Sequence, residues 1–267
     1  MTKLQLGLLA SSFFLLFSLY FGCETTPLDI RALEKSRALE IEAANPEVLI
    51  QEAKATLGPQ ALNEVMVLEE ELSRAPNDSA RVGILQELSG AWYRLENPAI
   101  AGDYAQQVAE LLGDAESWSI AATTYTICVQ RTEAGRLREF CTDRAVQAYE
   151  SAISLDPADI SHKVNLALLY TENPPAENPM RGISMLLDLN SQEPENVLIL
   201  NSLGRLAIRT GQYDRALERL QKALRLDPDN ATTPCLLAQV YDGLGDAAQA
   251  ETFNDRCRQL ARADSSN

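Results

Sequence analysis

Side chains that could do chemistry are few in this sequence of 267 residues. It has a single histidine, His162, and no Cys-x-x-Cys pair, so the usual ligand spacings of a zinc site are missing. A Gly-rich phosphate loop, a Gly-x-Ser-x-Gly elbow and kinase motifs are also missing. The adjacent carboxylates at 69–71 could serve acid–base chemistry, but such a run on a helix is usually a solvated face. The sequence therefore predicts no catalytic residue, no metal site and no cofactor.

The five cysteines have different expected roles. Cys128 and Cys141 lie on either side of the expected turn of a helical hairpin. They could form a disulfide in an oxidising compartment, and two reduced, buried thiols are the alternative. Cys235 is expected to face a groove and Cys257 the core, so a bond between those two is less favoured.

The fifth cysteine, Cys23, closes an amino-terminal targeting pattern. Residues 1–3 are a short basic start, and residues 4–21 form an apolar run of the length expected for a signal peptide. A glycine directly before Cys23 resembles the bacterial lipobox, which implies cleavage after residue 22 and lipid on the Cys23 thiol. We therefore expect a lipoprotein signal peptide over 1–22 and a lipid-anchored tether with a short helix over 23–44. An uncleaved signal anchor is the alternative.

Composition and charge favour a helical fold and disfavour some partners. Alanine and leucine dominate, aromatic residues make up 6%, and no run of alternating Val, Ile and Thr indicates a strand. The formal net charge of -15 repels phosphate backbones, so we expect no nucleic-acid partner.

The clearest structural pattern lies in residues 197–230, which predict two short helices joined by a turn. Apolar residues recur there at spacings of three and four. Gly211 stands where the first helix must stop, and Pro228 where the second must. Small residues interrupt the apolar stripes where the helices would cross, namely Gly204, Ala216 and Ala223. Close antiparallel packing is the consequence.

These positions resemble the tetratricopeptide repeat, whose period is about 34 residues. The resemblance implies an all-α, right-handed solenoid of helix-turn-helix repeats, in which stacked hairpins bury one another's apolar faces. We expect this array over 115–264. An extended hairpin around 126–144 should protrude from it, because that repeat has 11 extra residues. Residues 45–114 are expected to form degenerate, repeat-like helical hairpins.

The resemblance also implies where a partner would bind. Ligands of such repeats lie in a concave groove lined by the first helix of each repeat, at repeat positions 2, 5, 9 and 12. In this sequence the positions hold Val164, Leu168, Thr171, Leu198, Asn201, Arg205, Ile208, Thr232, Cys235, Gln239 and Asp242. This mixture suits an extended peptide or a helix rather than a small-molecule substrate.

The sequence thus predicts a non-catalytic protein–protein interaction scaffold anchored by lipid in the bacterial cell envelope. Its partner would be another envelope protein or a peptide, in a process such as outer-membrane assembly or secretion. Glu24 is not the aspartate that retains some lipoproteins at the inner membrane, so the outer membrane is favoured. Two alternatives stay open: an enzyme with a carboxylate site in the amino-terminal third, and a cytoplasmic scaffold or co-chaperone with an uncleaved amino terminus.

Overall fold

The computed structural model describes residues 45–264. The expected signal peptide, Cys23 and the tether lie outside the described residues. The chain divides into two units, 1–51 and 52–267, which are considered separately. In the first unit, the described residues form the start of α3 (Pro46–Thr56). There the Asn45 carboxamide oxygen accepts a hydrogen bond from the backbone N–H of Glu47 at 3.1 Å.

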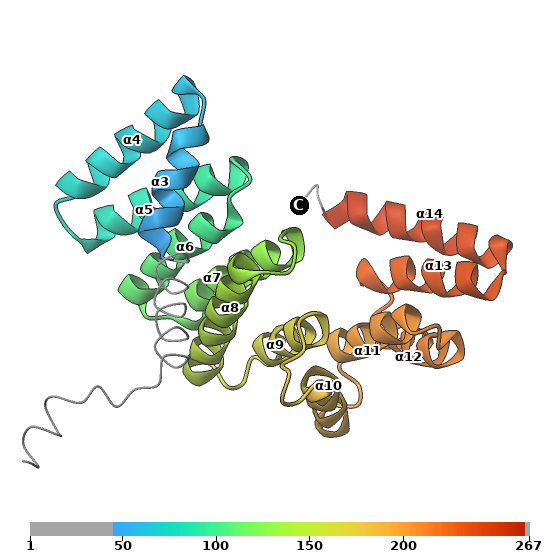
Figure 1. Ribbon diagram of the computed structural model, residues 1–267. Coiled ribbons are helices and arrows are strands. Elements are labelled where there is room, and N and C mark those ends of the chain that lie inside the picture. The colour runs from blue at the N-terminus through green and yellow to red at the C-terminus, as the bar shows by residue number, and fades with distance from the viewer. Residues whose placement is uncertain (1–44, 265–267) are drawn as a thin grey trace, which may run out of the picture. The chain divides into compact units, whose positions relative to one another are not determined.

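The second unit is built from helices and short connections, and no strand occurs between residues 45 and 264. After α3 the helices are α4 (Pro59–Arg74), α5 (Asp78–Arg94), α6 (Pro98–Leu112), α7 (Ala115–Arg131), α8 (Arg136–Leu155), α9 (Ile160–Glu172), α10 (Arg181–Gln192), α11 (Val197–Arg209), α12 (Tyr213–Leu226), α13 (Thr232–Leu244) and α14 (Ala247–Asp264) (Figure 1).

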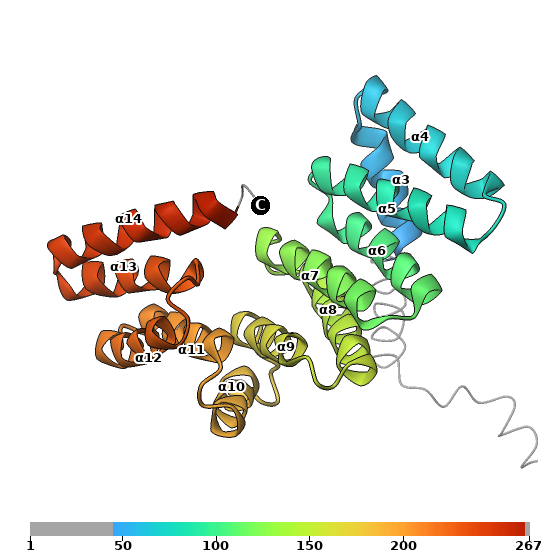
Figure 2. The same cartoon turned by 180° about the vertical axis from the view of Figure 1, so that it is seen from behind.

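Consecutive helices pack as antiparallel pairs. The pairs are α5 with α6, α7 with α8, α9 with α10, α11 with α12, and α13 with α14 (Figures 1 and 2). The second helix of each pair packs on the first helix of the next, as α8 does on α9 and α12 on α13. Among the first helices, α11 also packs on both α9 and α13. The predicted all-α repeat fold is confirmed.

The ends of α11 and α12 follow from local chemistry. The Asn196 side chain accepts hydrogen bonds from the backbone N–H groups of Leu198 and Ile199, at 3.1 and 3.3 Å, and so caps the start of α11. Gly211 follows the end of α11 with φ of 70°, a left-handed conformation that glycine adopts without strain. Pro228 lies just beyond the end of α12. Both predicted helix ends are confirmed.

The crossing of α11 and α12 depends on small residues, as predicted. A Cβ atom added to Gly204 would lie 2.7 Å from Leu220, and Ala216 and Ala223 are fully buried. Ala216 and Leu220 belong to a core cluster that also contains Leu237 of α13. One repeat therefore completes the core of the next.

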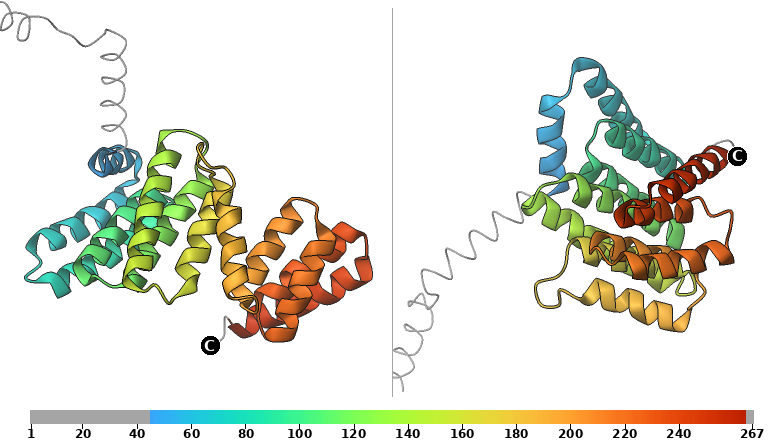
Figure 3. Two further views of the ribbon diagram at one scale, coloured as in Figure 1. Left: turned by 90° about the horizontal axis from the view of Figure 1, so that it is seen from below. Right: turned by 90° about the vertical axis from the view of Figure 1, so that its right-hand side faces the viewer.

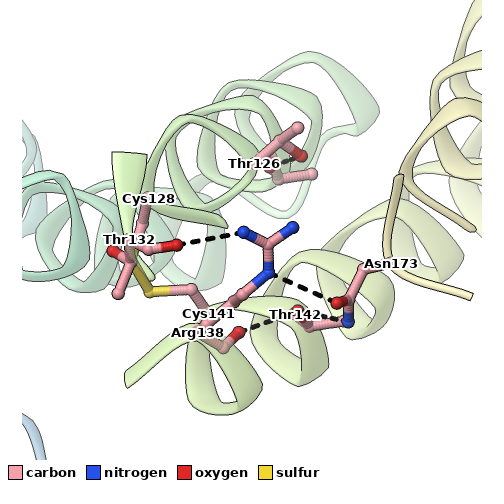
Figure 4. Close-up of a disulfide and its surroundings, with 8 residues drawn as sticks. Thr126, Cys128, Thr132, Arg138, Cys141, Thr142 and Asn173 are labelled. Carbon is pink, nitrogen blue, oxygen red and sulfur yellow. Dashed lines mark hydrogen bonds between the residues drawn. A yellow bond between two sulfur atoms is a disulfide. The ribbon is translucent and has the colours of Figure 1, made fainter. Parts of the chain in front are cut away.

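The extra residues of the α7–α8 pair lengthen its helices. α7 has 17 residues, α8 has 20, and residues 132–135 connect them, so the pair is longer than its neighbours (Figure 3). Cys128 and Cys141 lie at similar distances from this turn and form a disulfide with Cα atoms 6.0 Å apart (Figure 4). Of the two alternatives that the sequence left open for these cysteines, the structure has the disulfide.

The tip of this hairpin is tied to the following repeat. Arg138 donates to the carbonyl oxygen of Thr132 at 3.0 Å and to the Asn173 side chain at 3.4 Å (Figure 4). Asn173, just after α9, donates in turn to the Thr142 hydroxyl at 3.0 Å. The tip is therefore held against the end of α9 and does not stand free of the array.

A second disulfide joins Cys235 of α13 to Cys257 of α14, with Cα atoms 4.9 Å apart. The sequence prediction, which disfavoured this pair, is wrong here. It placed each cysteine by the face of its own helix. Cys235 and Cys257 lie at nearly equal distances from the turn near Gly245, so they are at the same level of the antiparallel hairpin, and the bond shows that both side chains point into the α13–α14 interface.

Candidate partner-binding groove

Two of the predicted groove residues are buried, and the prediction for them is wrong. Val164 is 0% exposed and Asn201 is 4% exposed. Val164 packs in a cluster with Ile199 and Leu203, because its side of α9 lies in the seam with α11 and not on the open face.

Asn201 occupies the equivalent seam between α11 and α13. Its amide nitrogen donates to the side-chain oxygen of Asn230 at 3.2 Å, and its oxygen accepts from the Thr233 hydroxyl at 3.1 Å. Thr233 is itself fully buried. The amide thus joins two repeats and is not available to a partner.

The remaining predicted residues differ in how far they are open to solvent. Exposed residues among them are Leu198, Arg205, Thr232, Gln239 and Asp242. Leu168, Thr171 and Ile208 are partly buried, and Cys235 is partly buried and held in its disulfide. A partner that binds on this face would therefore contact the five exposed residues first.

A groove that the sequence analysis did not identify opens between α7 and α9. Its volume is about 530 Å³. It is lined by Ala115, Glu116, Ser119, Ile120, Thr123, Thr124, Asp156, Asp159, Ser161 and His162. Counting Ala115 as position 1, Glu116, Ser119 and Thr123 hold positions 2, 5 and 9. The offset rule already applied to α9, α11 and α13 would have found them if it had been extended to α7.

Asp159 shapes the α9 side of this groove. Its carboxylate caps α9 by accepting from the backbone N–H of Ser161 at 2.8 Å. Hydrogen bonds from the hydroxyl and the backbone N–H of Ser161 hold the pKa of Asp159 below its usual range. The groove therefore keeps a carboxylate charge at neutral pH.

The single histidine lies beside this carboxylate. His162 Nε2 is 3.4 Å from a carboxylate oxygen of Asp159, and the histidine side chain is nearly buried. Its Nδ1 atom has no hydrogen-bond partner in the described part of the chain. No serine or cysteine in residues 45–264 is bonded to the imidazole as a nucleophile would be to its base.

The groove offers one apolar contact inside a polar, acidic rim. Ile120 is 55% exposed, and the hydroxyls of Ser119 and Thr123 accompany it. The carboxylates of Glu116, Asp156 and Asp159 make the lining acidic. Such a surface can hold an apolar side chain of a peptide and accept hydrogen bonds from cationic or N–H groups beside it.

The amino-terminal helices have a different cleft, between α4 and α5, of about 760 Å³. Its Glu64 forms an ion pair with Arg94 at 2.8 Å, and nearby Glu69 pairs with Lys54. Burial, and then the charge of Glu69, raises the pKa of Tyr104. Glu64 and Glu69 thus pair with cations, whereas a general acid needs apolar or anionic surroundings.

Metal and membrane features are missing from the part of the chain that the structure describes. Between residues 45 and 264, no three His, Cys, Asp or Glu side chains come together as metal ligands. No helix in that range combines the length and apolar character needed to span a bilayer.

Fold and groove together define an all-α helical repeat protein with an exposed first-helix face. Residues 207–266 match the family model described as tetratricopeptide repeat. The TPR repeat-containing protein PA4667 of Pseudomonas aeruginosa is 28% identical over 190 residues, which cover 69% of this chain and 31% of the relative. The match thus spans about a third of that relative's length.

Two solved structures share the fold. A tetratricopeptide repeat protein from Parabacteroides merdae has 15% identity and a TM-score of 0.51, over 80% of this chain and 79% of its own. The thermophilic TPR protein TTC0263 of Thermus thermophilus has 18% identity and a TM-score of 0.50, over 69% of this chain and 94% of its own. These two likenesses show a shared helical-repeat fold.

Proposed function

We propose that this protein is a non-catalytic scaffold that binds a peptide or protein partner along its first helices. The groove between α7 and α9 carries this proposal, because it combines exposed Ile120 with hydroxyl and carboxylate groups on one surface. Tetratricopeptide-repeat proteins generally mediate protein–protein interactions. The partner segment would bring an apolar side chain to Ile120 and a cationic or N–H group to the carboxylates beside it.

The compartment that fits this scaffold is the bacterial cell envelope. Two disulfides suit an oxidising compartment and not a cytosol that keeps thiols reduced. The amino-terminal pattern ending at Cys23 fits a lipoprotein, and Glu24 favours the outer membrane. A multiply acylated Cys23 would hold the protein at the membrane and raise its local concentration near an envelope partner.

Site-specific crosslinking in cells tests the partner site. A photoreactive residue at Thr123, inside the groove, should give a crosslinked product of defined mass. The matched control is Gln147, exposed on α8 outside this groove. Equal products from both positions, or none from Thr123, would contradict the assignment.

A charge placed in the groove tests its apolar contact. Ile120→Asp should weaken capture of the crosslinked partner by about tenfold or more, because it buries a carboxylate against an apolar group. The melting temperature should not change, since Ile120 is 55% exposed. Leu155→Asp on α8 is the control, because Leu155 is 50% exposed outside this groove. Equal binding by the Ile120 variant and the control would remove Ile120 from the site.

The lipid anchor is tested separately. Mass spectrometry of the membrane form should find an acylated fragment beginning at Cys23, and Cys23→Ser should release the protein from the membrane fraction. A fragment that retains Met1 and an unmodified Cys23 would support the cytoplasmic alternative.

A further inference from the structure

Four cations of α12 line one cleft beside α10. Arg215, Arg219, Lys222 and Arg225 are separated by four, three and three residues, which places them along one side of the helix. The cleft has a volume of about 380 Å³. Its other lining residues are Asn190, Pro194, Leu200 and Glu218.

The charge of this cleft is opposite to that of the whole chain. The protein has a net charge of -15, yet residues 197–226 contain six Lys and Arg against two Asp and Glu. Lys222 and Arg215 donate to neutral oxygens, those of Pro194 and Gln212, each at 2.8 Å. Within residues 45–264, none of the four cations is ion-paired. Four cations against the single carboxylate of Glu218 therefore leave the lining of this cleft net positive.

The repeat fold accounts for one of the four cations. One period later, Arg256 donates to the Pro228 carbonyl at 2.7 Å, as Lys222 does to that of Pro194. Both bonds fasten a second helix to the end of the preceding repeat. The positions that follow the three arginines by one period hold Gln249, Phe253 and Gln259. Arg181 lies one period before Arg215, so it is Arg219 and Arg225 that have no cation at the equivalent position of either neighbouring repeat.

Two further features, one in the cleft and one on residues next to its lining, point to a peptide. Asn190 Oδ1 is buried without a hydrogen-bond partner in the described chain, and a buried acceptor of this kind needs a donor. Leu187, one turn before Asn190, and Leu226, next to Arg225, are both exposed leucines. A simple anion would neutralise the arginines and leave both leucines uncovered.

We infer that this cleft binds an acidic segment of a protein partner. Carboxylates of the segment would pair with Arg215, Arg219 and Arg225, whose guanidinium groups can each hold a carboxylate through two hydrogen bonds. A backbone N–H of the segment would donate to Asn190, and an apolar side chain would cover one of the leucines. This surface belongs to the second helices and does not depend on the groove between α7 and α9.

The test is a titration of the full protein with a fluorescently labelled Glu/Leu copolymer peptide, followed by fluorescence anisotropy. Reversing the three arginines together (Arg215→Glu, Arg219→Glu and Arg225→Glu) should weaken binding by about a hundredfold, since charge-assisted contacts are lost and repulsion is added. The control reverses three exposed arginines elsewhere and changes the net charge equally: Arg81→Glu, Arg131→Glu and Arg258→Glu. Binding by the control should stay within about twofold of the original.

Further arms distinguish the ligand class. Inorganic polyphosphate and phosphatidylglycerol vesicles should compete poorly with the peptide. Equal weakening in both triple variants, no binding of the peptide, or stronger arginine-dependent binding of polyphosphate or vesicles would each overturn the inference. Circular dichroism melting of both triple variants verifies folding, and Arg219→Gln alone provides a milder variant. Ile120→Asp should leave peptide binding unchanged. A negative result for the cationic cleft can therefore be distinguished from a negative result for the groove between α7 and α9.

Discussion

Asp159 connects the start of α9 to the acidic rim of the groove. Asp159→Ala removes the helix cap and should lower the free energy of unfolding at pH 7 by about 1 kcal/mol. Folding lowers the pKa of this carboxyl, so its stabilising effect is present above the unfolded-state pKa of about 3.9 and is lost as pH falls through the folded value. Urea unfolding at neutral pH and in acid measures both effects.

The same experiment has an internal control in Asp159→Asn. This variant keeps a side-chain acceptor for the Ser161 N–H and should retain most of the stability, with little dependence on acid. If Asp159→Ala lowered the free energy of unfolding, relative to the original protein, by the same amount in acid as at neutral pH, the carboxylate charge would not be involved.

Asn201 distinguishes a structural amide from a ligand-binding one. Asn201→Ala should lower the free energy of unfolding by about 1–3 kcal/mol, because it removes the bonds to Asn230 and Thr233 inside a closed seam. Gln239→Ala, at an exposed position of α13, should change it by less than about 0.5 kcal/mol. Chemical denaturation measures the pair. Equal, small effects would return Asn201 to the list of groove residues.

At the scale of elements, the contact between α9 and α10 requires a glycine. A Cβ atom on Gly182 would lie 2.4 Å from the Ala167 carbonyl oxygen and 2.7 Å from the Thr171 nitrogen, both backbone atoms that cannot rotate away. Gly182→Ala should therefore destabilise the protein by about 1–3 kcal/mol.

The matched control for this prediction is Gly83→Ala in α5, where an added Cβ has no atom within 4 Å. Alanine is the better helix former by up to about 1 kcal/mol, so this variant should be neutral or stabilised. Thermal melting of the two variants should shift in opposite directions. A loss of stability at both sites would show that helix propensity and packing are not what separates them.

The disulfides that join paired helices give a second prediction at the scale of elements. Alkylation of the denatured, unreduced protein should leave the four cysteines between residues 45 and 264 unmodified, and prior reduction should add four alkyl groups by mass. Replacing Cys128 and Cys141 by serine should cost about 3 kcal/mol on the chain-entropy model, since the bond closes a short loop. Free thiols at these positions in the unreduced protein would contradict the oxidised state.

For the whole molecule, nearest-neighbour packing predicts how damage spreads. Leu220 and Ala216 of α12 share a core cluster with Leu237 of α13. Deleting residues 232–267 should therefore raise amide hydrogen exchange strongly in α11 and α12, and much less in α5 to α7, because each repeat is stabilised mainly by its neighbours. Exchange measured by mass spectrometry tests this. A uniform rise along the chain would indicate one cooperative core instead.

Charge also acts at this scale. The net charge of -15 is spread unevenly, since residues 45–114 contain twelve Asp and Glu against four Lys and Arg, whereas residues 197–226 are basic. Average charge argues against a phosphate backbone as the general partner, but it does not reveal a local cationic cleft. Only the packing of α12 beside α10 shows that the four cations line one space.

The sequence by itself determined the helices, their ends and the close crossings. Gly211, Pro228 and the small residues at 204, 216 and 223 act through local backbone geometry and side-chain size, which are readable from spacing. It also predicted that the apolar stripe of each helix is buried, because a helix of period 3.6 presents one face to its neighbour.

Tertiary structure alone decided which flank of each first helix is covered. Val164 and Asn201 lie in seams, Cys235 lies opposite Cys257, and a groove opens between α7 and α9. Each of these depends on the register within a hairpin or on the rotation between successive hairpins. Side-chain packing across repeats sets both quantities, so the spacing within a single repeat does not encode them.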